Sequence, residues 1–414
     1  MDSDKQTLIE RNTLENFCTK AFVKAGLSEE DAQLSAKILV AADVRGIPSH
    51  GVGRMMRYIK GLECRQMLPD AKPEILRESP VSITVDANGA MGFPVSYKTM
   101  RKVIEKAETS GMACGSVRNS NHFGIAGYYA MMALEHDMIG VAMTNTAALG
   151  VPTFGRDVMF GTNPLAFCAP GNKTRAFVLD MATTTVTRGK LEVYDRTGHE
   201  LPSGWAVDAS GHPASDAGKV LRDMLERKGG GILPLGGFGE LFSGYKGYGL
   251  AVMVDILCAM LSGAPTGPDV FDTPETSARV SHFFGAIKIS AFTDPEEFRR
   301  DMDDLLGKIR NSPRAEGCAR IYVPGEKEFE AEERNNRNGI PVDRKSYENL
   351  KRSQKNIKSE WSFENEKYLV GKSGRCYYRR RGSSRRRDRF GMSRIRCISI
   401  AVGASHGKLA DSRG

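Results

Sequence analysis

The sequence predicts an α/β protein with a helical segment before the sheet and a basic tail after it. Apolar runs of strand length alternate with helical periods between about residues 81 and 193, which is the pattern of an α/β sheet. The first 65 or so residues show helical periodicity only. With 414 residues, 40% of them hydrophobic and 26% charged, the chain has an ordinary globular composition and is long enough for two domains.

Three helices are predicted in the N-terminal segment. Apolar residues recur with helical spacing over residues 13–25. A second helix is expected to begin after the N-cap Ser28 and to run to about residue 44. After a break that contains a proline, a third helix is expected to start at Ser49 or His50.

The middle of the chain supplies the predicted sheet. The expected order is strand 81–86, helix 94–110, strand 112–117, helix 125–136, strand 138–144, an apolar run at 164–169, a buried strand at 176–180 and helix 182–193. A further apolar stretch, residues 248–264, contains Asp255 and is too short for a membrane span, so we expect a buried helix there.

The composition argues against several classes of protein. The eight cysteines include no C-x-x-C pair, so neither a disulfide framework nor a zinc or other metal site is expected. This cysteine usage and the polar start of the chain favour a cytoplasmic protein over a secreted one.

The positive charge is confined to the end of the chain. Residues 359–414 hold 14 Lys and Arg against 5 Asp and Glu, which accounts for the whole net charge of +9. The preceding 358 residues are neutral, which argues against a nucleic-acid-binding surface on the body of the protein. The tail carries the runs 379–381 and 385–387 of arginine and is predicted to be disordered or a basic arm.

Two histidines in loops of small residues are the strongest candidates for a site. His50 lies in Ser49-His50-Gly51, and His122 lies between Asn121 and Phe123-Gly124. One helical turn places residues i and i+4 on one face, so Arg54 is expected to share a pocket with His50. An arginine can hold a carboxylate, and a histidine can exchange a proton with a carbonyl oxygen. The pair therefore predicts a pocket for a substrate that carries both groups.

Short polar loops are expected to form the rim of this pocket. They are residues 118–122, 144–146, 161–164 and 180–183, each interpreted as following an apolar run. Ligands of α/β sheets bind at the carboxyl ends of strands. The glycine-rich segments 233–237 and 244–249 can approach phosphate, but no G-x-G-x-x-G follows a strand.

The chain resembles the type-2 malate/L-lactate dehydrogenase family, which includes sulfolactate and ureidoglycolate dehydrogenases and diketogulonate reductases. The resemblance covers roughly residues 10–350. It depends on motifs that occur in family order: residues 49–54 with Tyr58, 117–124, 144–146, 161–165, 179–183 with 188–190, 202–205, 233–237, 245–250 and 323–326.

The resemblance implies a sulfolactate dehydrogenase-like fold. In it, a non-classical dinucleotide-binding sheet domain is inserted in a helical/α+β domain. Applied to this chain, residues 1–75 form an N-terminal helical segment and residues 76–260 the cofactor-binding domain. Residues 261–358 pack back on the N-terminal part, and residues 359–414 form the basic tail. A homodimer with no membrane association is implied.

The same resemblance implies NAD or NADP as cofactor, a small carboxylate as substrate, and Arg54 as ligand of that carboxylate. The implied cofactor contacts are Thr146, Asn163, Asp180, Met181, Ala182, Thr183, Thr184, Tyr245, Lys246, Pro324, Gly325 and Glu326.

The implied reaction is hydride transfer between nicotinamide and the hydroxyl-bearing carbon of a 2-hydroxy acid. His50 is the preferred acid–base group because Arg54 is expected on its helix face, with Ser49 and Asp180 as candidates to orient it. His122 then holds the substrate. Within the family both histidines have been assigned the proton-transfer role, so the choice stays open.

Each candidate also has an ordinary structural interpretation. The histidines can serve local hydrogen bonds, Arg54 can form a surface ion pair, and Asp180 can cap a helix over 182–193. Lys246 can be a solvated loop charge. Hydroxyl and amide side chains in turns usually bond nearby backbone, which is the alternative for Thr146, Asn163 and Thr183.

An alternative function is nucleic-acid binding through the arginine-rich tail on a dehydrogenase-like scaffold. The sequence leaves open which 2-hydroxy acid is used, and whether the cofactor is NAD or NADP.

Overall fold

The structure, a computed structural model, describes residues 6–273, 275–357, 369–370 and 376–377. The predicted basic tail lies outside these residues except for two short paired strands, β12 (Leu369–Val370) and β13 (Cys376–Tyr377). Within the described part, no helix is long and apolar enough to cross a membrane.

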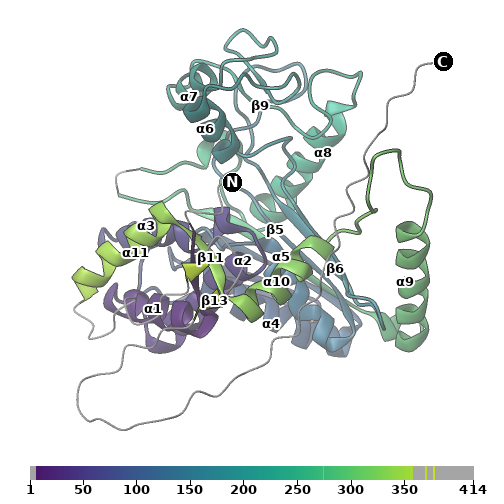
Figure 1. Cartoon of the computed structure of the whole chain (residues 1–414). Coiled ribbons are helices and arrows are strands. Elements are labelled where there is room, and N and C mark those ends of the chain that lie inside the picture. Colours follow the sequence, from purple (N-terminus) through teal and green to yellow (C-terminus); the bar gives the residue numbers. More distant parts are fainter. Residues whose placement is uncertain (1–5, 274, 358–368, 371–375, 378–414) are drawn as a thin grey trace, which may run out of the picture.

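Three helices form the N-terminal segment, as predicted (Figure 1). They are α1 (Arg11–Lys24), α2 (Glu29–Val44) and α3 (Met55–Glu63). The Ser28 hydroxyl accepts a hydrogen bond from the Asp31 amide at 3.2 Å, so the predicted N-cap is confirmed.

The predicted start of the third helix at Ser49 or His50 is wrong. Two 3₁₀ turns, Pro48–His50 and Val52–Arg54, precede α3. The Val52 amide donates to the Asp43 carboxylate at 2.7 Å instead of joining an α-helical ladder, which explains why a regular helix does not begin earlier.

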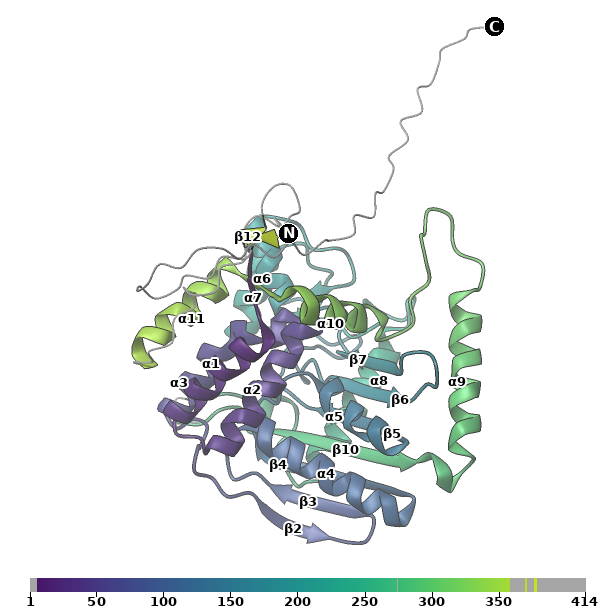
Figure 2. The same ribbon diagram turned by 60° about the horizontal axis from the view of Figure 1, so that its bottom comes forward.

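Seven strands form one mixed sheet in the order β2-β3-β4-β10-β5-β6-β7 (Figure 2). Their bounds are β2 (Glu74–Glu78), β3 (Ser82–Asp86), β4 (Met112–Ser120), β5 (Met138–Thr144), β6 (Leu165–Ala169), β7 (Phe177–Met181) and β10 (Val280–Lys288). Five were predicted. The edge strand β2, whose residues are all exposed, and the central strand β10 were missed.

The position of strand β10 determines which strand ends lie together at one end of the sheet. It lies antiparallel between β4 and β5, so these two strands run in the same direction and end at one edge. Because β6 runs antiparallel to both β5 and β7, its start lies at that edge too. The loop 161–164 therefore reaches the edge by preceding β6, not by following a strand of the sheet as expected.

Helices cover both faces of the sheet. On one face, α4 (Gly92–Ser110) and α5 (Ala126–Met132) share the main hydrophobic core with the N-terminal helices. On the other, α8 (Gly244–Asp255) packs on Met143 and Phe283 through a small core. The predicted buried helix over 248–264 is only half correct: α8 continues as a π-helical turn (Ile256–Met260), and Met260 is 62% exposed.

Two other expectations near β7 are wrong. This strand is the sheet edge, and of its residues only Val178 is buried, so it is not the buried strand predicted. The helix expected over 182–193 is α6 (Arg188–Thr197), and Thr183 and Thr185 before it donate backbone hydrogen bonds to Thr162 and Leu233. Asp180 is therefore too far from α6 to cap it.

A small second hydrophobic core is separate from the main one and lies at the top of Figure 1. It is formed by α6, α7 (Ala217–Leu225) and the paired strands β8 (Ala206–Val207) and β9 (Gly231–Ile232).

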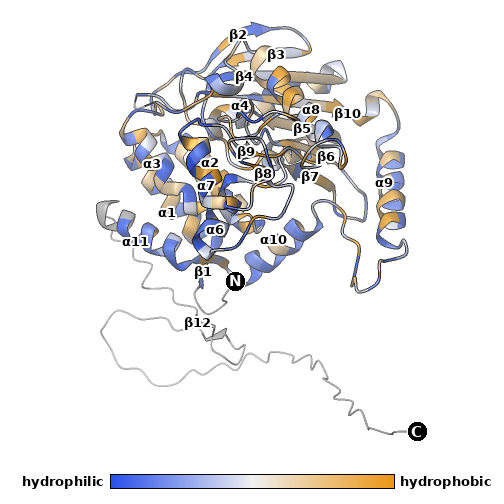
Figure 3. Cartoon of the chain, turned by 90° about the horizontal axis from the view of Figure 1, so that it is seen from above, coloured by the Kyte–Doolittle hydropathy of each residue, from blue (hydrophilic) through white to orange (hydrophobic). Residues whose placement is uncertain are grey.

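The C-terminal elements return to the N-terminal helices. After α9 (Pro295–Arg310) come α10 (Glu326–Asn338), β11 (Ile340–Asp343) and α11 (Arg344–Ile357), and β11 pairs antiparallel with β1 (Gln6–Ile9). Figure 3 shows α10 and α11 as largely hydrophilic, consistent with helices that cover a surface. The proposed domain limits remain a prediction, but β10 belongs to the sheet although it follows residue 260.

Candidate functional site

A cavity of about 290 Å³ opens at the edge where β4 and β5 end; we call it the histidine cavity. It brings together five residues singled out in the sequence: Ser49, His50, Arg54, His122 and Thr146. The 3₁₀ turns supply the first three, and the loops after β4 and β5 supply the others.

His50 lies in this cavity as a neutral imidazole. Its Nδ1 atom is 3.0 Å from the Ser49 hydroxyl, which can either donate or accept. Burial and the nearby Arg54 charge lower the pKa of His50 to about 4. The Arg54 Nε donates back to the Ser49 carbonyl, which keeps the guanidinium beside this turn although no α-helix connects the two residues.

His122 stacks near His50, with ring centroids 5.5 Å apart and planes 24° apart. Its Nδ1 atom is 2.7 Å from the Tyr58 hydroxyl and 3.2 Å from the Gly124 amide. A backbone N–H can only donate, so the network assigns Nδ1 as the acceptor and Nε2 as the protonated nitrogen. Burial, and secondly neighbouring charges, hold the pKa of His122 well below its usual value.

A third histidine, which is buried, bonds side chains at the ends of both strands that lead to this cavity. His282 on β10 is fully buried, with Nδ1 2.8 Å from the Thr144 hydroxyl and Nε2 2.8 Å from that of Ser120. Its ring also stacks on Phe123 at 4.4 Å. His282 therefore joins the ends of β4 and β5. This role was not predicted, because β10 was not recognised in the sequence.

Thr146 lines the histidine cavity, whereas Asn163 lies outside it and bonds the backbone of Thr146. The buried Asn163 accepts from the Thr146 amide at 3.2 Å and donates to Asp255 at 3.1 Å. Asn145 donates to the other oxygen of Asp255, also at 3.1 Å. Burial raises the pKa of Asp255. This network ties α8 to the strand ends and leaves Asn163 facing protein.

Of the candidate residues that follow β7, some bond to neighbouring protein groups and none lines the histidine cavity. Thr183 and Thr184 are buried, and their hydroxyls donate to the carbonyls of Thr162 and Val186. The side chain of Thr183 thus bonds backbone, which was its ordinary structural interpretation, and that of Thr184 does the same. Met181 and Ala182 are half-buried and line neither of the two cavities described here.

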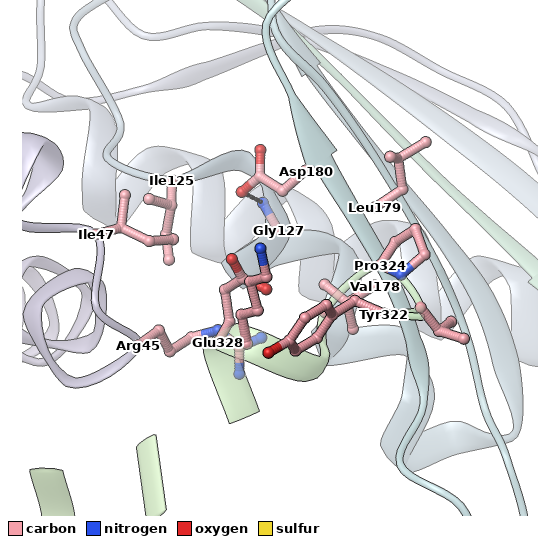
Figure 4. Close-up of a pocket in the computed structure, with 13 residues that line it drawn as sticks. Arg45, Ile47, Ile125, Gly127, Val178, Leu179, Asp180, Tyr322, Pro324 and Glu328 are labelled. Atoms are coloured by element: carbon pink, nitrogen blue, oxygen red, sulfur yellow. Dashed lines mark hydrogen bonds between the residues drawn. The ribbon is translucent and has the colours of Figure 1, made fainter. Parts of the chain in front are cut away.

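Asp180 lines a second cavity, of about 320 Å³, which we call the Asp180 cavity (Figure 4). Its carboxylate accepts from the Gly127 amide at 2.7 Å, at the first turn of α5. Loss of water around the carboxyl group raises its pKa to about 6, although Asp180 keeps exposed surface and the Gly127 bond and Arg45 act in the opposite direction. The expectation that Asp180 orients His50 is not met: Asp180 bonds α5 and lines a different cavity.

Of the three predicted contacts near α10, two reach the Asp180 cavity. Pro324, which Figure 4 labels, and the next residue, Gly325, line it. Glu326 is buried instead, where it pairs with Arg310 and with Arg320 and accepts from the Val323 amide at 3.0 Å. Burial acts to raise the pKa of Glu326, but these bonds outweigh it and lower the pKa. The same bonds anchor the start of α10.

The two cavities are neighbours. Ser49 and Gly124 line the histidine cavity, whereas Ile47 and Ile125, two residues and one residue away from them in sequence, line the Asp180 cavity. Tyr245 and Lys246 line neither one; they lie on the first turn of α8, with the ammonium 5.9 Å from the Tyr245 ring centroid.

Several residues at the histidine cavity were not assigned to the site in the sequence analysis, although Tyr58 and Arg188 belong to the family motifs named there. Arg57, Arg188 and Arg279 line it, and Tyr58 holds His122. Tyr58 had a usable signal, since it lies four residues after Arg54. Arg279 had none, because it precedes the unpredicted strand β10. Among the described residues, no group of three His, Cys, Asp or Glu side chains could hold a metal ion.

This arrangement can bind an anion beside two neutral imidazoles. A carboxylate at Arg54 would lie close to His50, which can take a proton, and to His122, whose Nε2–H can donate a hydrogen bond.

Comparison with known proteins agrees with this chemistry. Residues 9–351 match the family model described as malate/L-lactate dehydrogenase. The chain is 44% identical to a malate dehydrogenase of Pyrococcus abyssi over 342 residues, which are 83% of this chain and 92% of that protein. It is 40% identical to the L-sulfolactate dehydrogenase of Methanocaldococcus jannaschii, over 79% of this chain and 91% of that one.

The fold agrees as well. The crystal structure of malate dehydrogenase from Entamoeba histolytica superposes with a TM-score of 0.83 at 32% identity, covering 87% of this chain and all of that one. The match to the family model ends before the arginine-rich tail. The comparisons support the dehydrogenase interpretation and not the nucleic-acid-binding alternative.

Proposed function

The chain belongs to the malate/L-lactate dehydrogenase family, and on this premise we propose that it is an NAD(P)-dependent oxidoreductase that interconverts a small 2-hydroxy acid and its 2-oxo acid. The observation that carries the proposal is the histidine cavity, in which Arg54 lies beside two neutral imidazoles.

The residues present fit a nicotinamide cofactor. The histidine cavity combines Thr146 and Thr162 with the apolar Leu149 and Pro164, a lining suited to a flat amide-bearing ring. The neighbouring Asp180 cavity offers Pro324, Gly325 and the first turns of two helices to the rest of a dinucleotide. When bound, the nicotinamide supplies or accepts the hydride.

The polar side chains of the histidine cavity have separable roles. Arg54 binds the carboxylate next to the reacting carbon. His122 donates from Nε2 to the substrate oxygen and cannot take a proton on Nδ1, which is occupied by the Gly124 N–H. His50 can exist in either tautomer because the Ser49 hydroxyl can donate or accept. His50 is therefore the group that takes the proton during oxidation and returns it during reduction.

The test compares two alanine variants at saturating cofactor. We expect His50→Ala to lower kcat by about 10²–10⁴-fold, and His122→Ala to raise the KM for substrate more than it lowers kcat. The exposed His199 provides the control, since His199→Ala should leave both constants unchanged. If His50→Ala retains near wild-type kcat, the assignment of the proton-transfer group is wrong.

The cofactor and the setting are open to direct measurement. Initial rates with a panel of 2-oxo acids against NADH and NADPH identify the preferred cofactor. We also propose a cytoplasmic homodimer, and free thiols at the described cysteines are compatible with a reducing compartment. Sedimentation analysis of the full chain tests the dimer.

A further inference from the structure

We propose that Asp255 is a positioning residue for the cofactor, which acts through two buried amide side chains on Thr146 in the wall of the histidine cavity. The two amides belong to Asn145 and Asn163. Asp255 lines neither cavity, so it acts through other residues. This role rests on the proposed function, in which Thr146 belongs to the lining offered to the nicotinamide ring.

The first observation is that an acid occupies a buried position. Asp255 is 8% exposed, and Asn145 and Asn163 are fully buried. Burial raises the pKa of Asp255, and the hydrogen bonds from the two amides act in the opposite direction. Replacing buried charged groups by well-packed apolar residues is often neutral for stability. Stability alone therefore does not account for an acid at this position.

The backbone fixes the orientation of both amides. The Ser281 amide donates to Oδ1 of Asn145 at 2.8 Å, and the Thr146 amide donates to Oδ1 of Asn163 at 3.2 Å. A backbone N–H can only donate, so the NH2 group of each side chain points the other way. Both NH2 groups donate to Asp255, one to each carboxylate oxygen, at 3.1 Å. A carboxylate, which accepts on both oxygens, completes this arrangement.

Thr146 is held closely by this network and by the neighbouring loop. Its amide bonds Asn163, and its hydroxyl accepts from the Thr162 amide at 3.0 Å. An ideal Cβ on Gly161 would lie 2.0 Å from the Thr146 hydroxyl, so the backbone of that loop passes directly against it. Thr146 is half-buried and lines the histidine cavity. A displacement of Asn163 would therefore move a residue of the cavity wall.

Asn163 has a backbone conformation that needs support. Its φ is 34°, in the left-handed region that few side chains adopt but asparagine tolerates. Its NH2 group also donates to the Ala251 carbonyl at 2.9 Å, one turn before Asp255 on α8. Strained backbone persists where surrounding groups over-determine it, and it is concentrated at functional sites. Here the surrounding groups are Asp255 and the helix that carries it.

The test measures binding of the cofactor directly. Titration of NADH and of NADPH with the full chain, followed by nucleotide fluorescence, gives Kd, and steady-state rates at saturating cofactor give the KM for the 2-oxo acid. Asp255→Asn keeps the shape of the side chain but sets an NH2 group against one of the two amide NH2 groups. We expect Kd for the preferred cofactor to rise by about 10-fold or more, and the KM for the 2-oxo acid to change by less than about 3-fold.

A reciprocal exchange provides the rescue. In the double variant Asn145→Asp/Asp255→Asn the carboxylate moves to position 145, where it can still accept from the Ser281 amide. The carboxamide at position 255 then donates to that carboxylate and accepts from Asn163. The exchange gives up the weak donation from Asn145 to the Pro265 carbonyl at 3.5 Å. We expect the double variant to bind the cofactor at least about 5-fold more tightly than Asp255→Asn.

Asp303→Asn is the control for lost stability. Asp303 on α9 accepts from the backbone amides of Asn172, Lys173 and Thr174 in the loop between β6 and β7. This loop lies at the opposite end of the strands from the histidine cavity. We expect this variant to lower the midpoint of thermal unfolding but to leave Kd for the cofactor within about 2-fold of the wild type.

The outcomes separate the two proposals. If the wild-type chain binds neither NADH nor NADPH, the proposed function fails. If Asp255→Asn binds the cofactor as the wild type does, or loses no more affinity than Asp303→Asn, Asp255 has a structural role alone and the positioning role is overturned. A double variant that does not fold, or that binds no more tightly than Asp255→Asn, also overturns it. If Asp255→Asn does not fold, the double variant should bind within about 10-fold of the wild type, and weaker binding overturns the role.

Discussion

His50 and His122 face each other across 5.5 Å, and neither carries a charge near pH 7 in the free protein. Burial is the main cause at both residues, and positive neighbours add to it. An anionic substrate reverses part of this effect, because a carboxylate at Arg54 offsets the guanidinium charge that lowers the pKa of His50. Substrate binding thus prepares His50 to carry a proton in the reducing direction.

This leads to a prediction for the pH dependence of oxidation. His50 must be unprotonated to take the proton, and its pKa in the free protein is about 4. We expect kcat/KM for oxidation of the 2-hydroxy acid to stay constant from about pH 8 to about pH 5 and to fall only below that, after correction for substrate ionisation. Initial rates of reduced-nicotinamide formation at constant ionic strength measure this. An acid limb centred near the ordinary histidine pKa of about 6.5 contradicts it.

For single residues, the sequence predicted the chemistry of the site more successfully than it predicted the side-chain contacts that position it. His50, His122 and Arg54 were recognisable from their loops and spacing, and all three reach one cavity. The side chains that hold them were not, because a hydrogen bond such as that from Tyr58 to His122 spans 64 residues. Asp180 was recognisable as a strand-end carboxylate, but which helix it bonds depends on tertiary packing.

Among the elements, the last turn of α2 determines the path of the chain that carries His50. Asp43 is buried, accepts from the Val52 amide at 2.7 Å and packs against Gly51, where an ideal Cβ would lie 2.1 Å from the carboxylate. Burial, opposed by the Val52 bond, raises the pKa of Asp43 to about 7. The folded state therefore binds this proton more tightly than the unfolded chain does.

We expect Asp43→Asn to gain stability relative to the wild type as the pH rises. Asn keeps an acceptor for the Val52 amide but never becomes a buried anion. The raised pKa favours the folded wild type at low pH, and this contribution is lost between about pH 4 and pH 7. The relative gain should reach on the order of 4 kcal/mol above pH 7. Denaturant unfolding of both proteins across this range measures it, and a difference independent of pH would contradict the assignment.

A variant in the central strand β10 provides a test in which the stabilising group is a buried neutral histidine instead of a buried acid. His282→Phe preserves a ring but removes the hydrogen bonds to the buried hydroxyls of Ser120 and Thr144. Because the Thr144 hydroxyl keeps its bond to the Ser281 carbonyl at 3.0 Å, the free energy of unfolding at pH 7.5 should fall by about 1–3 kcal/mol in total. Burial lowers the pKa of His282 to about 3, so the wild type loses stability as the pH falls below about 6.5, where the unfolded chain takes up the proton. The deficit of the variant should therefore shrink at pH 5. A deficit that grows on acidification is incompatible with a neutral His282.

The strands that were predicted have apolar runs, whereas the two that were missed lack a plain pattern. Strand β2 is exposed along its whole length. Strand β10 has its periodicity interrupted by His282 and Gly285, and it is paired on both sides, with β4 and with β5. Local sequence could not indicate that a strand 136 residues after β5 would be inserted beside it, and this insertion brings Arg279 to the cavity.

In the whole molecule, strand β1 and the elements β11 and α11, which are far apart in the sequence, come together beside the turns that carry His50 and Arg54. Strand β1 pairs with β11, and α11 then packs on the 3₁₀ turn that contains Gly53, where an ideal Cβ would lie 3.0 Å from the Ser346 hydroxyl. Asn335 on α10 donates to the backbone carbonyls of Asp43 and Val44 at the end of α2. The C-terminal elements thus support the turn that carries His50 and Arg54.

This architecture predicts different effects for two truncations. A chain that ends at residue 357 keeps α11 and all of the region matched by the family model, so we expect its kcat/KM for the preferred 2-oxo acid to stay within about 2-fold of that of the full chain. A chain that ends at residue 343 lacks α11 and uncovers the 3₁₀ turns, so we expect a lower midpoint of thermal unfolding and a raised KM for the 2-oxo acid, because Arg54 loses its support. Steady-state kinetics and thermal unfolding of the three chains measure this. Loss of activity on removal of residues 358–414 alone would mean that the arginine-rich tail takes part in the reaction.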